Sequence, residues 1–207
     1  MTSISKGALF IVSAPSGAGK TSLLKALFTV INNICVSISY TTRAKRPHEQ
    51  EGVDYYFVTK SVFQEMLAAG AFLEHAEVFG NFYGTSRAWV EAERAKGLDV
   101  ILEIDWQGAE QVSRQYPKVE SIFIVPLGRE ILLERLKKRH QDNEAVIEAR
   151  MREAKDHLAH YHHYHYLIIN DQFEAALQDL KAVLMSSRLR LPRQQEAQVE
   201  LLKKLLS

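Results

Sequence analysis

Cysteine is nearly absent from this sequence of 207 residues, in which Cys35 is the only one. A single cysteine excludes an intramolecular disulfide and a zinc site built on cysteine ligands. Cys35 lies in an apolar run, where cysteine behaves as a small buried hydrophobe. The simplest expectation is therefore a reduced thiol in a cytoplasmic protein.

Long apolar runs and an excess of one charge are also missing. No stretch is apolar over the length of a membrane-spanning helix, and residues Met1 to Lys6 lack the apolar region of a secretory signal peptide. The formal net charge is +1, which creates no overall attraction for nucleic acid or for an anionic membrane. We expect neither as a partner, and any phosphate chemistry must depend on local groups of Arg and Lys.

The composition that remains is ordinary for a globular protein, with 46% hydrophobic and 25% charged residues. The length suits one domain with a sizeable core and small insertions. Apolar, β-branched runs alternate with helical patterns, which predicts an α/β fold built on a doubly wound parallel sheet. The expected strands of this sheet are 8–12, 34–38, 100–105, 122–125 and 167–170.

Three segments fall outside this alternation. Residues 39–87 contain short alternating runs around a helical pattern, and we expect a small mixed β insertion there. Residues 144–157 form a highly charged helical pattern with a thin apolar stripe, as expected of a mobile lid. The tail, residues 188–206, is basic and amphipathic, so its apolar side chains need cover from the chain's own core or from a second subunit.

A glycine-rich segment joins the first expected strand to the first expected helix. It reads Ala14-Pro15-Ser16-Gly17-Ala18-Gly19-Lys20-Thr21 and matches the pattern G-x-x-x-x-G-K-[ST] except at Ala14, which requires a negative φ. Between a strand and a helix, such a loop directs backbone N–H groups and the helix N-terminus at one point, which suits a polyphosphate. Lys20 would serve the β- and γ-phosphates, and the Thr21 hydroxyl would be a ligand of Mg²⁺. An ordinary turn before a helix is the alternative, but the flanking elements, Lys20 and Thr21 together favour a nucleoside triphosphate site.

Donors for a second phosphate follow the next expected strand. Arg43 and Arg46 lie just beyond a strand end, where ligands collect in open α/β sheets. Guanidinium groups suit the bidentate grip on a phosphate dianion that transfer to a monophosphate requires. Tyr55 and Tyr83 add hydroxyl donors from the insertion. Two arginines in a solvated loop are the alternative, which the hydroxyl-rich residues 39–42 make less attractive.

Six motifs, in order along the chain, resemble the guanylate kinase family. They read SYTTRAKR, GVDYYFV, FLEHAEVFGNFYGT, LEIDWQG, RLKKR and LIIND, and with the phosphate loop they cover nearly the whole chain. The resemblance implies phosphorylation of GMP or dGMP by ATP, with Mg²⁺ as the cofactor. It also implies one domain over residues 6–186, with a GMP-binding insertion at about 39–87 and a lid at about 129–157 that close around the two nucleotides. Residues 187–207 would form an amphipathic tail helix.

The resemblance also assigns roles to individual residues. For catalysis it implies Lys20, Arg43, Arg139 and Arg150. For ATP it implies the phosphate loop from Ala14 to Thr21 together with Arg139 and Asn170, and Thr21 as the metal ligand. For GMP it implies Ser39, Arg43, Arg46, Tyr55 and Tyr83 around the phosphate, and Glu74, Thr85 and Asp105 around the guanine.

The two carboxylates among these residues have alternative interpretations. Glu74 suits guanine because a carboxylate accepts from both the ring N1–H and the 2-amino group, but a surface glutamate in a strand fits its sequence equally well. Asp105, at the end of a buried strand, could reach guanine or a water molecule bound to Mg²⁺. The sequence does not choose between these roles.

Other functions also stay open. A different nucleoside monophosphate kinase, for thymidylate or adenylate, would differ at the base pocket. A non-catalytic protein-binding module of the same fold would typically lack the phosphate-loop lysine or the phosphate-binding arginines, and this chain has both. The histidines between residues 157 and 165 could bind a metal or simply be solvated.

Overall fold

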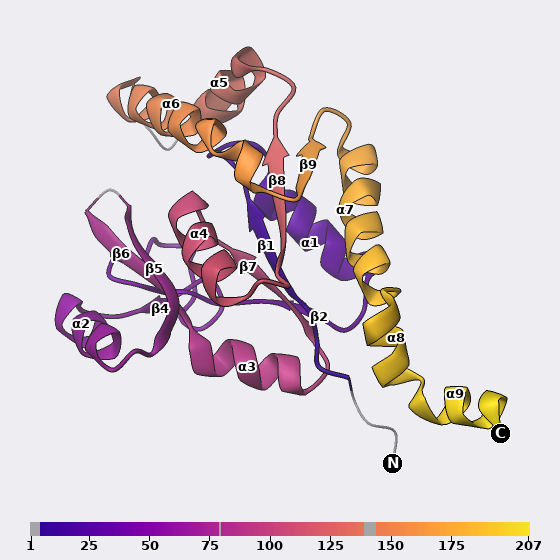
Figure 1. Ribbon diagram of the computed structural model, residues 1–207. Helices are drawn as coiled ribbons and strands as arrows, with labels where there is room; N and C mark the ends of the chain where they lie inside the picture. The colour runs from indigo at the N-terminus through magenta and orange to yellow at the C-terminus, as the bar shows by residue number, and fades with distance from the viewer. Residues whose placement is uncertain (1–4, 79, 139–143) are drawn as a thin grey trace.

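A five-stranded parallel sheet forms the centre of the molecule. The computed structural model describes residues 5–78, 80–138 and 144–207, and its larger sheet has the strand order β2-β7-β1-β8-β9 (Figure 1). Parallel neighbours require crossover connections, which helices supply here. The α/β class predicted from the sequence is confirmed. The strands are β1 (Leu9–Ser13), β2 (Ile34–Val36), β7 (Asp99–Glu103), β8 (Glu120–Val125) and β9 (Tyr166–Ile169).

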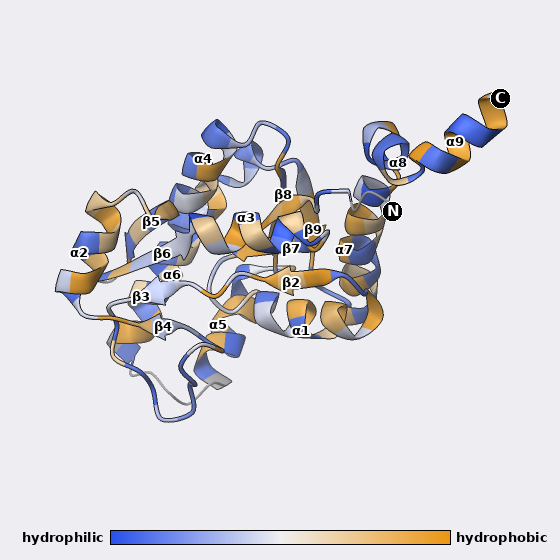
Figure 2. Cartoon of the chain, turned by 90° about the horizontal axis from the view of Figure 1, so that it is seen from below, coloured by the Kyte–Doolittle hydropathy of each residue, from blue (hydrophilic) through white to orange (hydrophobic). Residues whose placement is uncertain are grey.

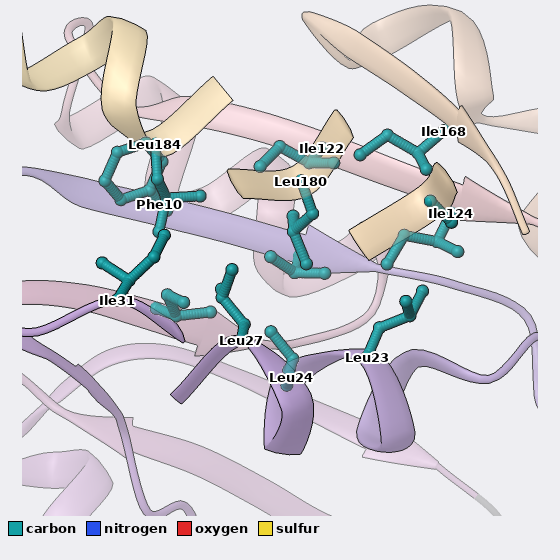
Figure 3. Packing of buried hydrophobic residues seen from close by; sticks show 13 residues of the cluster. Phe10, Leu23, Leu24, Leu27, Ile31, Ile122, Ile124, Ile168, Leu180 and Leu184 are labelled. Atoms are coloured by element: carbon teal, nitrogen blue, oxygen red, sulfur yellow. The ribbon is translucent and has the colours of Figure 1, made fainter. Parts of the chain in front are cut away.

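Helices cover both faces of this sheet, because successive residues of a strand point to opposite sides. In β1, Phe10 and Val12 pack with the helices of one face (Figure 3), whereas Leu9 and Ile11 pack with those of the other. All four side chains are almost fully buried. The first face is covered by α1 (Lys20–Val30) and α7 (Phe173–Arg188), and the second by α3 (Arg87–Ala95) and α4 (Trp106–Gln115).

The expected insertion forms a second, mixed sheet of order β4-β3-β6-β5. Phe63 of the neighbouring helix stacks on Phe72 and Phe82, with ring centroids 4.5 and 5.5 Å apart, and gives this unit its own small core. The sequence does not predict β3, whose two residues lie in a polar, basic segment and become a strand only through pairing with β4 and β6. The elements are β3 (Tyr40–Thr41), β4 (Tyr56–Phe57), α2 (Lys60–Ala68), β5 (Phe72–Val78) and β6 (Asn81–Ser86).

Two helices form the segment that we expect to be a lid, and the second of them lines the same cavity as the insertion. These are α5 (Arg129–Lys138) and α6 (Glu144–Ala159), followed by the short 3₁₀ helix η1 (Tyr161–His163). They pack on each other through Leu132, Leu136, Ile147 and Ala154. Leu132 also lies close to the phosphate loop, since a Cβ atom added to Gly17 would be 3.1 Å from its Cδ1.

The tail differs from the single helix that we expect over residues 187–207. Helix α7 runs on to Arg188, and two short helices follow, α8 (Leu191–Ala197) and α9 (Val199–Leu206). Pro192 lies in the first turn of α8, where its missing N–H costs nothing but where it cannot continue a preceding helix. Figures 1 and 2 show α9 extending away from the body of the molecule. Within the described residues, no helix combines the length and the apolar character needed to cross a membrane.

A buried carboxylate fastens this end of the chain to the sheet. Asp99, at the start of β7, is 0% exposed and accepts hydrogen bonds from Arg188 Nε at 2.8 Å and Arg193 Nη2 at 2.6 Å. It also accepts from the backbone N–H of Ala8. Two cations and a backbone donor thus compensate one buried charge, and they hold α7 and α8 against β7.

We expect Asp99→Asn to lower the free energy of unfolding by about 2–4 kcal/mol, because two partly buried guanidinium groups would lose their counter-ion. Glu200→Gln is the matched control, since its pair with Lys203 leaves both side chains 70% exposed and should contribute less than about 0.5 kcal/mol. Urea denaturation measures both. Equal stability of the two variants would show that Asp99 does not anchor the tail.

Candidate active site

One cavity of about 430 Å³ joins the phosphate loop, the insertion, the end of β7 and helix α6. Polar and charged side chains make up most of its lining, which suits ionic ligands. The residues from the loop are Ala14, Pro15, Ser16, Gly17, Gly19, Lys20 and Thr21, and those from the insertion are Ser39, Arg46, Tyr55, Glu74, Ala76, Val78 and Tyr83. Glu103, Ile104 and Asp105 line it from β7, and Arg150, Glu153 and His157 from α6.

The phosphate loop owes its shape to two glycines with positive φ. Gly17 has φ 91° and Gly19 has φ 93°, a conformation that residues with a Cβ rarely adopt. Gly19 is the N-cap of α1, so the N-terminus of that helix opens into the cavity beside Lys20. Among the described residues, Asn33 is the one non-glycine with positive φ. Ala14 therefore has the negative φ that its side chain requires, and alanine replaces the first glycine of the pattern without backbone strain.

Glu103 contacts both functional side chains at the start of α1. Its Oε1 lies 3.5 Å from Lys20 Nζ and accepts a hydrogen bond from the Thr21 hydroxyl at 3.2 Å. The sequence reasoning did not single out Glu103, although it stands at the carboxyl end of a strand that pairs with β1, which is where ligands of such sheets collect. Oxygen atoms from Thr21, Glu103 and Asp105 in one cavity are the donor set that a hard divalent cation such as Mg²⁺ takes.

Asn170 and Arg135 hold the phosphate loop from the side of β9 and α5. Asn170 is 3% exposed and donates from Nδ2 to the Ala18 carbonyl at 2.7 Å, while its Oδ1 is buried without a partner. A Cβ on Gly19 would lie 2.3 Å from the same Nδ2, so glycine is needed there for contact as well as for φ. Arg135 reaches the carbonyls of Ala18 and Asn170 at 3.4 Å each. Arg135 belongs to the RLKKR motif, but sequence reasoning gave it no role.

Four of the residues expected around the GMP phosphate do line the cavity, namely Ser39, Arg46, Tyr55 and Tyr83. The rings of Tyr55 and Tyr83 meet edge to face at 5.9 Å. Burial raises the pKa of Tyr55 to about 12, and the neighbouring Tyr83 and Glu103 act in the same direction. Its phenol therefore stays protonated and can donate a hydrogen bond to a phosphate oxygen.

Arg43 is the exception, because the cavity lining does not include it. Its Nη2 donates to Glu49 Oε1 at 2.6 Å and its Nη1 to the Ala44 carbonyl at 2.8 Å. Glu49 also accepts from the backbone N–H of Arg46 at 2.8 Å. Burial acts to raise the pKa of Glu49, but these hydrogen bonds outweigh it and hold the pKa below the usual range. Glu49, which the sequence reasoning missed, thus connects both arginines of this loop.

Glu74 is the most deeply buried carboxyl group of the cavity, with 4% of its surface exposed. A register shift between Phe72 and Glu74 in β5 places it opposite Thr85 of β6. Space for the carboxylate depends on Gly108, since a Cβ there would lie 2.6 Å from Glu74 Oε2. Burial raises the pKa of Glu74 to about 7, and the negative charge of Asp105 adds to the effect. Proximity to Thr85 opposes the shift, although the Thr85 hydroxyl lacks a hydrogen bond of good geometry.

Asp105 follows β7 and lines the cavity together with the phosphate loop and the insertion. Its Oδ1 caps α4 by accepting from the Gly108 N–H at 2.9 Å, and its Oδ2 is buried without a partner. The capping explains its fixed position at the end of β7. The free oxygen is available to a ligand that donates a hydrogen bond.

Helix α6 contributes a cation, an acid and a histidine to the cavity. Arg150, Glu153 and His157 lie on one side of α6. Burial lowers the pKa of His157, whereas Asp105 acts to raise it, and burial raises the pKa of Glu153. Arg139, the other lid arginine expected at the site, lies outside the residues that the structure describes.

The histidines that follow α6 make ring contacts. His160 stacks on Trp106 with centroids 3.7 Å apart and an interplanar angle of 5°, and His162 lies 4.0 Å from His163. Within the described part of the chain, no three side chains of His, Cys, Asp or Glu come close enough to hold a metal ion. The Trp106 stack instead joins the end of α6 to the start of α4.

Comparison with known proteins identifies relatives along the whole chain. The guanylate kinase of Saccharophagus degradans is 57% identical over 201 residues, which is 97% of this chain and 98% of that protein. The guanylate kinase of Legionella pneumophila is 49% identical over 207 residues, 100% of this chain and 99% of that one. The crystal structure of guanylate kinase from Anaplasma phagocytophilum superposes with a TM-score of 0.73 at 35% identity, covering 93% of this chain and 92% of that one.

The family model for guanylate kinase matches residues 6–187. This match includes the phosphate loop and the residues of the cavity from the insertion, from β7 and from α6. The chain therefore belongs to the guanylate kinase family.

Proposed function

We infer that this protein phosphorylates GMP, and dGMP, with ATP and so forms GDP or dGDP and ADP. The observation that carries the inference is a buried carboxyl group, Glu74, in the same cavity as a phosphate loop with its lysine. The phosphate loop supports a nucleoside triphosphate as donor. Glu74 supports guanine as the base of the acceptor.

Glu74 selects guanine through hydrogen-bond polarity. As a carboxylate it accepts from guanine N1–H and from the 2-amino group, and the free oxygen of Asp105 lies in the same cavity. Adenine presents no such pair of donors, so AMP would leave a buried charge unpaired at a cost of about 1–3 kcal/mol or more. Thr85, opposite Glu74 on β6, supplies a hydroxyl group beside the base.

At the donor end, Lys20 and the N-terminus of α1 bind the β- and γ-phosphates. Thr21 and Glu103 would hold Mg²⁺, which supplies neutralisation of phosphate charge when bound. Glu103 would release Lys20 to the phosphates as the nucleotide enters. Asn170 and Arg135, which grip the phosphate loop, would lie beside the adenosine.

Transfer of the γ-phosphoryl group needs positioning and charge neutralisation more than covalent help from the protein. Ser39, Arg46, Tyr55 and Tyr83 hold the acceptor phosphate, which is already ionised and needs no general base. Arg150 approaches the group in transfer from α6, and we assign Arg139 the same role. Arg43 bridges the two phosphates after exchanging its contact with Glu49 for one with substrate. Closure of the lid, residues 129–157, over a core with the insertion at 39–87 excludes water.

A panel of acceptors tests the function. With ATP as donor and coupled detection of ADP, we expect kcat/KM for GMP and dGMP to exceed that for AMP, UMP and dTMP by at least about 100-fold, because only guanine satisfies a buried Glu74. Preference for dTMP or AMP would indicate another nucleoside monophosphate kinase. Binding of nucleotides without ADP formation would indicate a non-catalytic module.

We expect Lys20→Ala to lower kcat by about 10²-fold or more while the fold stays intact, since this lysine serves ligand charge and its ion pair with Glu103 is partly exposed. Lys25→Ala is the matched control, because Lys25 is an exposed lysine of the same helix. The measurement is kcat together with thermal unfolding. Unchanged turnover in a folded Lys20→Ala protein would contradict the phosphate-loop assignment.

We also propose that two copies of the chain associate through α9. Leu201, Leu205 and Leu206 of this helix are 53, 72 and 88% exposed, and they lie beyond the ion pairs that hold α8 to the core. A second copy of the same helix would cover them.

Sedimentation velocity of the Leu201→Gln, Leu205→Gln double variant tests the association. These substitutions leave Arg188 and Arg193 on Asp99, so they spare the fold, which a truncation before Arg188 would not. We expect the full-length protein to sediment as an oligomer and the variant as a monomer. Identical monomeric masses would reject the association.

A further inference from the structure

The carboxyl group of Glu74 is buried, and no cation near it in the described part of the chain balances its charge. Among the described residues it forms no ion pair, and the charged group that acts on it most strongly is another acid, Asp105. The cavity does contain Lys20, Arg46, Arg150, Glu103, Glu153 and His157, from the loop, the insertion, the lid and β7, but none of these is among the groups that shift its titration. Because burial raises its pKa to about 7, both the ionised and the neutral form are accessible under ordinary conditions.

The ionised and the neutral form of this carboxyl group are complementary to different bases. An ionised carboxylate offers two acceptors, whereas a neutral carboxylic acid offers one acceptor and one O–H donor. Guanine presents two donors at this edge, N1–H and the 2-amino group. Xanthine presents N1–H and a 2-oxo acceptor, which matches the neutral acid, and hypoxanthine presents N1–H with no group at C2.

We propose that the protonation state of Glu74 sets the selectivity for the purine C2 substituent, so that this site also phosphorylates XMP when the carboxyl group is neutral. The inference deepens the proposed function and rests on it, since it assumes that Glu74 faces the base of the acceptor. The geometry that supports it is the position of the carboxyl group, which lines the cavity with 4% of the residue exposed, opposite Thr85 in the strand register and against Gly108.

The reaction with XMP is the same transfer with a different base. An oxygen of the XMP 5′-phosphate forms a bond to the γ-phosphorus of ATP, and the bond from that phosphorus to the β-bridging oxygen breaks. The electron pair of the broken bond stays on ADP, and the products are XDP and ADP. No oxidant, reductant or further reactant is needed.

Charge around the base strengthens the dependence on pH. Xanthine loses a ring proton more readily than guanine does, and an anionic ring would meet the negative charges of Glu74 and Asp105. Acidification therefore favours XMP twice, by neutralising the base and by neutralising Glu74. For GMP the effect is opposite, because the neutral acid would direct its O–H at a donor of guanine.

Glu74→Gln gives the side chain one acceptor and one donor at every pH. The amide oxygen accepts from N1–H, and the amide NH₂ donates to the 2-oxo group of xanthine. We expect the ratio of kcat/KM for XMP to kcat/KM for GMP to rise by about 10²- to 10⁴-fold over the wild type. The substitution removes the clash of two acceptors at the 2-oxo group of xanthine and creates a clash of two donors at the 2-amino group of guanine. IMP serves as the internal reference, since its edge has nothing at C2 for the side chain to match. Glu74→Leu, of similar volume, removes both polar atoms and should lose the preference between GMP and XMP.

The experiment measures kcat/KM for GMP, IMP and XMP in the wild type, Glu74→Gln and Glu74→Leu, and repeats the wild-type series from about pH 5.5 to about pH 8.5. Support would be a switch toward XMP in Glu74→Gln and a wild-type XMP/GMP ratio that rises on acidification. Acidification also neutralises the xanthine ring, so the wild-type rise counts as support where it exceeds the rise in the same pH series of Glu74→Leu, which has no carboxyl group to titrate. A constant wild-type ratio decides against the inference even if Glu74→Gln does not fold. A wild type that turns over GMP with an XMP/GMP ratio independent of pH, or a parallel loss of all three substrates in a folded Glu74→Gln, would overturn the inference alone. A wild type that does not phosphorylate GMP would overturn the proposed function itself.

Discussion

Burying a carboxyl group without a counter-ion costs several kcal/mol when the group is ionised, and this fold accepts that cost at Glu74. Gly108 leaves room for the group, and the register shift in β5 turns it toward the cavity opposite Thr85. The cost appears in the unliganded protein as a pKa of about 7 instead of one near that of a free glutamate. In the proposed function, guanine would supply the two hydrogen-bond donors that the protein does not provide, and the cost of burying the carboxylate would become selectivity for that base. A counter-ion within the protein would have stabilised the fold and weakened that selectivity.

The parallel sheet brings the donor and acceptor sites together through a single strand. Because β7 lies between β2 and β1, its carboxyl end reaches both the phosphate loop and the insertion. Glu103 contacts Lys20 and Thr21 on one side, and two residues later Asp105 caps α4 beside Glu74. We therefore expect a substitution at the carboxyl end of β7 to affect the binding of both nucleotides. Helix α6 lines the same cavity, and the stack of His160 on Trp106 joins the end of this helix to α4.

The sequence was most informative where structure is local. The phosphate loop, with its strand and its helix, is a continuous pattern in the sequence, and the structure confirms the predicted α/β sheet. Contacts between segments far apart in the chain could not be predicted from the sequence. Strand β3 exists only through its partners, and Pro192 divides a tail whose periodicity alone indicates one helix. The family membership is confirmed, whereas the roles of the individual site residues stay predictions.

Side-chain direction was also beyond the sequence. Arg43 has the residue type that a phosphate needs, yet its guanidinium donates to Glu49 and lies over the ring of Tyr55, beside the cavity and outside its lining. Glu103 and Arg135 lie inside quoted motifs, but only their contacts with the phosphate loop reveal what they do. Burial likewise excludes the surface-glutamate alternative for Glu74, which is 4% exposed, whereas its role at guanine stays a prediction.

The central claim is that Glu74 becomes ionised against guanine, and proton release on GMP binding tests it most directly. Titration calorimetry at about pH 7 in buffers of different ionisation enthalpy counts the protons, and Glu74→Gln corrects for those lost by the GMP phosphate. A group with a pKa of about 7 when free and a lower pKa when bound must release about half a proton at that pH. We predict that the wild type releases this much more than Glu74→Gln near pH 7, and that the difference vanishes near pH 9, where the free carboxyl group is already ionised. Equal proton release by the two proteins near pH 7 would contradict the account.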